Sequence, residues 1–69
     1  MLFRSQKAAI AEIRNIYEAK LAQLDVMHQS KLRASMDPDA RATLEQEFRR
    51  ERERLTTERD LKVEKARSS

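Results

Sequence analysis

The chain has 69 residues with no cysteine, no glycine and one proline, and its charged and its apolar side chains each make up 39% of it. A chain this short buries only a small core, and without cysteine no disulfide or thiolate metal site can reinforce that core. The net charge of +3 lies in the first half, because residues 1–36 carry six basic and three acidic side chains, whereas residues 37–69 carry nine of each. The arginine-rich second half is therefore a balanced mixture of charges and not a basic arm.

The overall composition favours one class of fold. Frequent Ala, Glu, Arg, Lys and Leu without glycine is typical of long helices and coiled coils. No apolar run approaches the roughly 20 residues that cross a bilayer, and the start of the chain lacks the apolar segment of a secretory signal. We expect an all-α protein, a single helical unit over residues 1–69, with an intracellular location and the compartment left open.

A first helix is predicted over about residues 3–35. Its apolar seam has spacings of 3, 4, 4, 3, 4 and 4 residues, in the order Ile10, Ile13, Tyr17, Leu21, Leu24, His28 and Leu32. Two consecutive steps of eleven residues keep this seam on one side of a nearly straight helix. Leu2, Phe3, Ile16 and Met27 fall beside the seam, so that the apolar face spans roughly 160°. A face this broad predicts two neighbouring helices rather than one.

A second helix is predicted over about residues 38–66, and its apolar stripe is thin. The stripe consists of Leu44, Phe48, Leu55 and Val63. Residues 49–54 surround most of the helix with charge, and the pairs Glu45–Arg49 and Glu58–Lys62 have the favourable spacing of four residues. Each such pair stabilises a helix by only about 0.2–0.5 kcal/mol. This helix is expected to contact a partner along one edge and to expose the rest to water.

The corner between the two helices is predicted at residues 35–38. Pro38 inside a helix would clash with the carbonyl of Ala34 at a cost of about 3 kcal/mol, but as the first residue of a new helix it is well tolerated. Asp37 is a favoured N-cap, and Asp39 places negative charge at the positive end of the helix. The first helix has no glycine to end it and is expected to stop near Ser35.

Folding the chain at this corner brings the two apolar stripes together. Position i then lies near position 73 minus i, which pairs Leu24 with Phe48, Tyr17 with Leu55 or Thr56, and Ile10 with Val63. This agreement favours an antiparallel helical hairpin of coiled-coil type. Two helices splayed at an angle across a partner remain the alternative, since an Asp-Pro start without a glycine stop permits both.

The sequence contains no recognisable site for chemistry. A phosphate-binding glycine loop, a nucleophile elbow and a zinc motif are all missing, and a hairpin of long helices offers no enclosed pocket. We therefore expect no enzymatic activity, no cofactor, no metal site and no small-molecule substrate. His28 is the single histidine and lies on the apolar seam, where it is a packing residue, a pH switch or one ligand of a metal shared between chains. The lack of a second histidine favours packing.

The predicted function is structural. The interface for protein helices is expected to contain the large residues of both stripes, namely Phe3, Ile10, Ile13, Ile16, Tyr17, Leu21, Leu24, Met27, His28, Leu32, Leu44, Phe48, Leu55 and Val63. The second predicted helix covers only part of the apolar face of the first, so another chain is expected to cover the rest of that face. Two arrangements follow equally from this pattern. One is a homodimer in which two hairpins form a four-helix bundle, and the other is a small accessory subunit of a larger filamentous, cytoskeletal or multisubunit complex.

The alternative function is electrostatic binding of nucleic acid or an anionic membrane through the first helix. Arg4 and Lys7 lie beside Leu2, Phe3 and Ile10, as in helices that lie on a membrane surface. Helix packing explains the same apolar residues more simply. Nucleic-acid binding by the arginine block is disfavoured, because glutamates alternate with the arginines and aromatic platforms for bases are lacking there.

Overall fold

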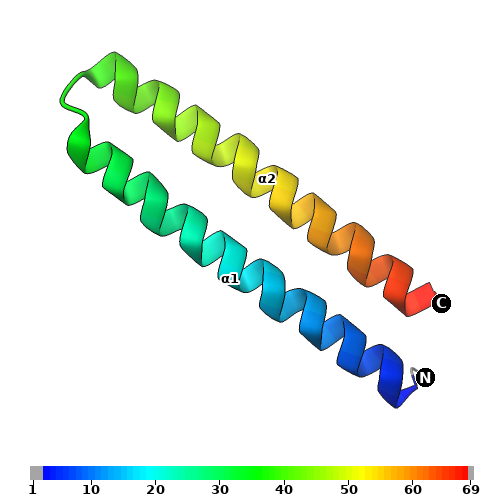
Figure 1. Cartoon of the computed structure of the whole chain (residues 1–69). Helices are drawn as coiled ribbons and strands as arrows, with labels where there is room; N and C mark the ends of the chain where they lie inside the picture. Colours follow the sequence, from blue (N-terminus) through cyan, green and yellow to red (C-terminus); the bar gives the residue numbers. More distant parts are fainter. Residues whose placement is uncertain (1–2, 69) are drawn as a thin grey trace.

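The computed structural model describes residues 3–68 and consists of two helices, α1 from Arg4–Ala34 and α2 from Pro38–Ser68. The helices run antiparallel and pack along their whole lengths, and the two ends of the chain lie together at the end opposite the corner (Figure 1). The backbone measures 52 by 15 by 11 Å. The prediction of an all-α helical hairpin is thereby confirmed, whereas Leu2 lies outside the described residues.

The corner forms where the cap residues place it. The side-chain Oδ1 of Asp37 accepts a hydrogen bond from the backbone N–H of Asp39 at 3.2 Å, so Asp37 is the N-cap and Pro38 the first helical residue of α2. Ser35 ends α1 in an extended conformation, with φ −100° and ψ 127°. No described residue has a positive φ, so this corner needs no glycine.

Long side chains connect the two helices at both ends of the hairpin. At the corner, Nη1 of Arg41 donates to the carbonyl of Leu32 at 2.9 Å and to that of Ser35 at 3.3 Å. The carbonyl of Leu32, in the last turn of α1, also accepts from the backbone N–H of the C-cap residue Ser35 at 3.3 Å. At the other end, Gln6 accepts from the N–H of Phe3 at 3.0 Å and donates to the carbonyls of Ala66 and Arg67 at 3.4 and 3.5 Å. Arg41 therefore supplements the backbone cap of a helix that ends without glycine, and Gln6 connects the start of α1 to the end of α2.

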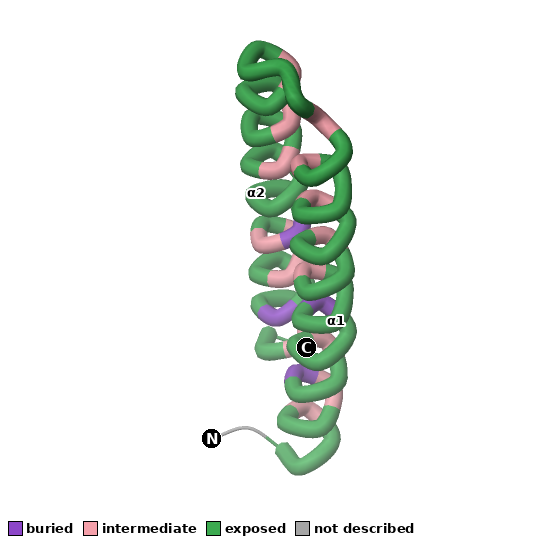
Figure 2. The backbone as a smooth tube through the Cα atoms, turned by 90° about the vertical axis from the view of Figure 1, so that its left-hand side faces the viewer, coloured by how far each residue is buried: buried purple, intermediate pink, exposed green. Residues whose placement is uncertain are grey.

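The core is a single row of side chains between the helices. Only Ile10, Tyr17, Leu55 and Val63 are buried among the described residues, and Tyr17 is the most enclosed at 2% exposure. They lie between the middle of the hairpin and the end that carries the termini, while most of the backbone elsewhere is exposed (Figure 2). Nearer the corner, the seam residues are half-buried. The hairpin therefore has little interior of its own.

The contacts that join the two stripes lie slightly farther along the helices than the predicted register. Phe48 stacks on His28, and the hydroxyl of Tyr17 bonds to Glu58. Leu24, which was predicted to lie beside Phe48 or Arg49, lines the same pocket as Phe48 and His28. Side chains in a helix lean toward its N-terminus, and in an antiparallel pair this lean shifts each contact by about one residue on both helices. Backbone carbonyls have no such lean, and the pairs that involve them, Arg41 with Leu32 and Gln6 with Arg67, keep the expected register.

Candidate helix-packing surface

Tyr17 is the centre of the contact between the helices. Its ring is enclosed, and its hydroxyl donates a hydrogen bond to Oε2 of Glu58 on α2 at 3.2 Å. The ammonium groups of Lys20 and Lys62 lie 4.9 and 5.2 Å from the centre of the ring, one from each helix. Such cation–π contacts are each worth about 0.5–1 kcal/mol at exposed positions. Tyr17 therefore combines the largest buried apolar surface with a polar bond that is specific to the register.

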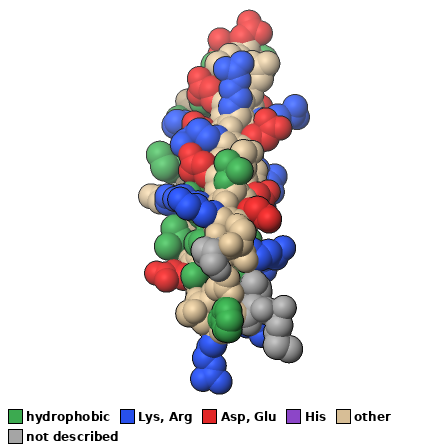
Figure 3. All heavy atoms as spheres, turned by 90° about the vertical axis from the view of Figure 1, so that its right-hand side faces the viewer, with side chains coloured by type: hydrophobic (Ala, Val, Ile, Leu, Met, Phe, Trp, Pro, Cys, Tyr) green, Lys and Arg blue, Asp and Glu red, His purple; other side chains and the backbone are tan. Residues whose placement is uncertain are grey.

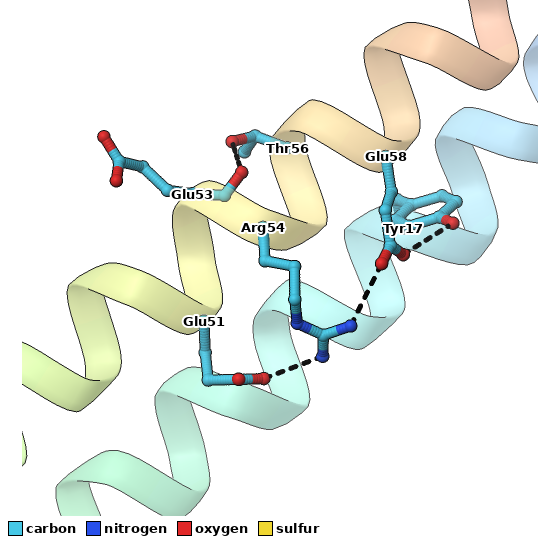
Figure 4. A network of polar contacts seen from close by, with 6 residues as sticks. All are labelled: Tyr17, Glu51, Glu53, Arg54, Thr56 and Glu58. Atoms are coloured by element: carbon cyan, nitrogen blue, oxygen red, sulfur yellow. Dashed lines mark hydrogen bonds and ion pairs between the residues drawn. The ribbon is translucent and has the colours of Figure 1, made fainter.

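A charged network on α2 continues from this hydroxyl (Figure 4). Arg54 donates from Nη1 to Oε1 of Glu58 at 3.0 Å and from Nη2 to Oε2 of Glu51 at 2.8 Å. The hydrogen bond and the positive charge of Arg54 hold the pKa of Glu51 below its ordinary value of 4.5, and these two carboxylates raise the pKa of Arg54. The figure also shows the hydroxyl of Thr56 donating to the carbonyl of Glu53 at 3.0 Å.

Glu58 with Lys62 and Glu45 with Arg49 were the predicted pairs, and neither forms an ion pair in the described part of the chain. The ion pairs found there join Arg54 to Glu51 and Glu58, and Arg59 to Asp60. The pKa of Lys62 is nevertheless raised, mainly by Tyr17 and to a smaller extent by the charge of Glu58. The hydroxyl of Tyr17 holds the carboxylate of Glu58 toward α1, where Arg54 also reaches it. Tyr17, a residue of the other helix, thus helps to set the orientation of the Glu58 side chain.

His28 packs its ring against Phe48. The ring centres are 4.2 Å apart and the planes differ by 17°, which is a stacked arrangement between α1 and α2. The packing role favoured for His28 agrees with this geometry. Within residues 3–68, no group of three or more His, Cys, Asp or Glu side chains is placed to hold a metal ion.

A shallow groove runs between the two helices on one side of the hairpin. Its floor is formed by Leu24, His28, Leu44, Phe48 and Leu55. The α1 wall consists of Lys20, Gln23, Met27 and Lys31, and the α2 wall consists of Glu47, Glu51, Arg54 and Glu58. We call this side of the hairpin, with its floor and two walls, the groove face. One wall carries two basic and no acidic side chains, while the other carries three acidic and one basic side chain.

Large apolar side chains remain exposed along the groove face. Met27 is 50% exposed in the α1 wall, Ile16 is 47% exposed and Leu61 is 66% exposed. At about 100° per residue, Ile16 falls within about 20° of Met27, and Leu61 within about 20° of Arg54, so both residues extend the groove face toward the termini. Figure 3 shows one view of the surface, in which hydrophobic side chains lie in small groups among Lys, Arg, Asp and Glu side chains.

The structure gives each residue of the predicted interface a definite place. Those buried between the helices are Ile10, Tyr17, Leu55 and Val63. Those half-buried along the seam are Ile13, Leu21, Leu24, His28, Leu32, Leu44 and Phe48. Those left exposed are Phe3, Ile16 and Met27. Contact of any of these side chains with another chain stays a prediction.

Several exposed apolar residues and several polar contacts of the hairpin were not predicted from the sequence. Leu61, Val26 and Met36 are 66, 68 and 96% exposed, and none of them belongs to a predicted stripe. Val26 and Met36 lie away from the groove face, on the outer side of α1 and in the corner. The spacing of Arg54 from Glu51 and Glu58, three and four residues, was a readable indication of the charged network. Nothing local indicated the roles of Gln6 and Arg41, because their partners are distant in the chain.

Comparisons with known proteins place no further constraint on this surface. No protein-family model matches the chain, and neither a curated protein nor a solved structure matches it. Within residues 3–68, neither helix has an apolar stretch of the length that a membrane crossing requires. The fold defines a helical hairpin, and its function must be argued from its own residues.

Proposed function

We propose that this protein is a non-enzymatic structural protein that works by packing its helices against helices of another protein chain. It acts either as a homo-oligomer or as a small accessory subunit of a larger assembly, and the groove face is its principal contact surface. The partner is a protein helix, and neither a cofactor nor a small-molecule substrate takes part.

The observation that carries this proposal is the excess of exposed surface. The hairpin exposes 5821 Å², although a compact monomer of 8.1 kDa is expected to expose only about 4500 Å². A pair of helices has no third element to cover the outer sides of its seam, so residues such as Ile16, Met27 and Leu61 stay in contact with water. Covering them with a further helix lowers the free energy by about 25 cal/mol per Å² of apolar area.

The charges support packing over binding to a phosphate backbone. Arg54 is bound by two glutamates, Arg59 by Asp60, and the guanidinium of Arg41 is used at the corner. Arginines whose charge is already paired release few counterions from DNA or from an anionic membrane. These arginines lie on α2, so their pairing disfavours nucleic-acid binding by the arginine-rich helix. Electrostatic binding through α1 is not the function that we propose, because helix packing explains the apolar residues of α1 more simply.

The experiment that tests the proposal combines circular dichroism with light scattering on the isolated chain over a wide range of concentrations. Helix content that rises together with mass supports a self-assembling protein. A poorly helical chain that becomes helical only when bound to another protein supports an accessory subunit, because the hairpin then lacks the core to fold alone.

Two outcomes contradict the proposal. The first is a helical and stable monomer at every concentration, which means that the exposed apolar residues need no cover. The second is tight binding to DNA or anionic vesicles that falls steeply with salt and persists at physiological ionic strength. A salt titration of both probes, run beside a matched neutral vesicle, distinguishes this second outcome from weak nonspecific attraction.

A further inference from the structure

We propose that the groove face binds a second copy of this chain, in a dimer that has both corners at the same end. This inference rests on the proposed function and names the partner and its orientation. Two hairpins then form a four-helix bundle in which α1 of each copy lies against α2 of the other. The two-fold axis of the dimer runs along the length of the hairpins.

The size of the surface agrees with a dimer of this kind. The hairpin extends 52 by 15 Å on its broad side. It exposes about 1300 Å² more than a compact monomer of its mass. Each partner in a standard stable interface buries about 800 Å² of accessible surface, so this excess is large enough for one such interface.

The charges of the two walls are complementary between copies. In the proposed dimer, the α1 wall with Lys20 and Lys31 faces the α2 wall of the second copy, which carries Glu47, Glu51 and Glu58. Lys20, Lys31 and Glu47 form no ion pair within the described residues, although the ammonium group of Lys20 lies over the ring of Tyr17. Glu51 and Glu58 already bind Arg54, so the charges of Lys31 and Glu47 are the ones most available to a partner. Charge complementarity of this kind sets the orientation of a complex more than its affinity.

The heights of these residues along the hairpin also match. The contacts of Tyr17 with Glu58 and of His28 with Phe48 show which positions of α1 and α2 are level. On this scale Lys20 lies within one turn of Glu58, and Lys31 lies within one turn of Glu47. A two-fold axis along the hairpin keeps every height unchanged, so each lysine reaches the corresponding glutamate of the second copy.

The exposed apolar residues are paired by the same axis. Ile16 is adjacent to Tyr17, and Leu61 lies one turn beyond Glu58, so the two residues are nearly level. On a single hairpin they sit on different helices and are 47 and 66% exposed. In the dimer, Ile16 of one copy packs against Leu61 of the other, and this contact occurs twice.

The opposite orientation brings like charges together. With a two-fold axis across the hairpins, α1 faces α1 and α2 faces α2, with their directions reversed. An α1 wall with two lysines and no acidic side chain then faces another such wall, and an α2 wall with three glutamates and one arginine faces another such wall, which is unfavourable. The pattern of the walls therefore selects the dimer with both corners at one end.

Disulfide cross-linking tests the arrangement directly. The chain has no cysteine, so the variants Ile16→Cys and Leu61→Cys each carry one thiol at an exposed position. Oxidation of an equimolar mixture is expected to give mainly the disulfide between the two variants. Each variant alone should give several-fold less dimer. A mixture of Glu18→Cys and Asp60→Cys, which are exposed and nearly level on the other side of the hairpin, is the matched control and should remain largely uncross-linked.

Charge reversal gives an independent test by sedimentation equilibrium. Lys31→Glu alone and Glu47→Lys alone should each self-associate about tenfold more weakly, since each places like charges at two symmetric contacts. An equimolar mixture of the two variants should regain the original association, because every contact is again between opposite charges. In the reversed orientation, Lys31→Glu would instead reduce the repulsion between two positively charged α1 walls and strengthen the dimer.

These outcomes separate the inference from the proposed function. A dimer in which Ile16→Cys cross-links to itself, or in which Lys31→Glu strengthens association, overturns the arrangement and leaves helix packing as the function. A chain that is unfolded alone and folds on another protein overturns the second copy as partner, again without touching the function. A stable helical monomer overturns both.

Discussion

Tyr17 joins the apolar and the polar parts of the helix contact in one side chain. It is the most enclosed residue of the hairpin, yet its hydroxyl reaches Glu58 and its ring lies beneath two lysines. A leucine in its place would fill the same row without fixing which residue of α2 lies opposite. The polar contact therefore adds specificity of register to the apolar burial.

The first prediction concerns this hydroxyl. Tyr17→Phe keeps the ring and removes the bond to Glu58, so the free energy of unfolding should fall by about 1 kcal/mol. Urea denaturation followed by circular dichroism measures this change. In a double-mutant cycle with Glu58→Ala, the two losses should be less than additive. Fully additive losses would mean that the two side chains do not interact in solution.

The second prediction concerns the acid sensitivity of Glu51. Arg54 holds the pKa of Glu51 below 4.5, so the folded state favours the charged carboxylate. Its contribution to stability is present above the unfolded pKa and is lost as the pH falls through the folded pKa. Glu51→Gln should therefore lower the melting temperature slightly at pH 7 and have no effect at pH 2. Melting curves from pH 2 to 7 check this, with the exposed Glu53→Gln as control, and a difference that persists at pH 2 would contradict it.

At the scale of the helices, the corner works without glycine because two side chains supply what the backbone lacks. Asp37 caps the first turn of α2, and Arg41 reaches back to the last carbonyls of α1. Arg41 lies one turn after the cap residue Asp37, so a side chain from the first turns of α2 donates hydrogen bonds to carbonyls at the end of α1. The corner is consequently a cooperative unit and not a free hinge.

The third prediction tests the cap. Asp37→Ala should destabilise the hairpin by about 1 kcal/mol, whereas Asp37→Asn should cost much less, because asparagine accepts the same hydrogen bond from Asp39. Thermal unfolding of the three proteins under identical conditions provides the comparison. Equal losses for alanine and asparagine would assign the effect to charge at the helix terminus and not to the cap.

At the scale of the whole molecule, the hairpin encloses few apolar side chains between its two helices. Among the described residues, four side chains are buried, and they lie in one part of a hairpin that is 52 Å long. The long, narrow shape spreads the few apolar residues along the surface instead of enclosing them. The proposed packing against further helices would cover these exposed residues.

The fourth prediction compares the seam with the charged surface. Leu24→Asp places a charge in the half-buried floor of the groove face and should cost at least ~2 kcal/mol, abolishing any assembly of the chain. Arg50→Ala alters an exposed position and should change stability by less than about 0.5 kcal/mol. Sedimentation and thermal melting measure both quantities. Equal effects of the two substitutions would show that the apolar stripe is wrongly assigned.

The sequence by itself determined the two helices, their corner and their apolar stripes. Pro38 and Asp37 act on the adjacent backbone, and the eleven-residue spacing of Ile10, Leu21 and Leu32 expresses the geometry of a single helix. Both effects operate within a few residues, so they can be read from the chain without knowing what lies opposite. The match of the two stripes favoured a hairpin and left two splayed helices as the alternative, and the tertiary structure decided between them.

The tertiary structure decided which side chains face each other. It joined Glu58 to Tyr17 and Arg54, stacked Phe48 on His28, and assigned Arg41 and Gln6 each to the end of the other helix. Each of these depends on the distance between residues far apart in the chain and on the lean of side chains along their helices. The opposite charges of the two walls of the groove face likewise appear only when both helices are side by side.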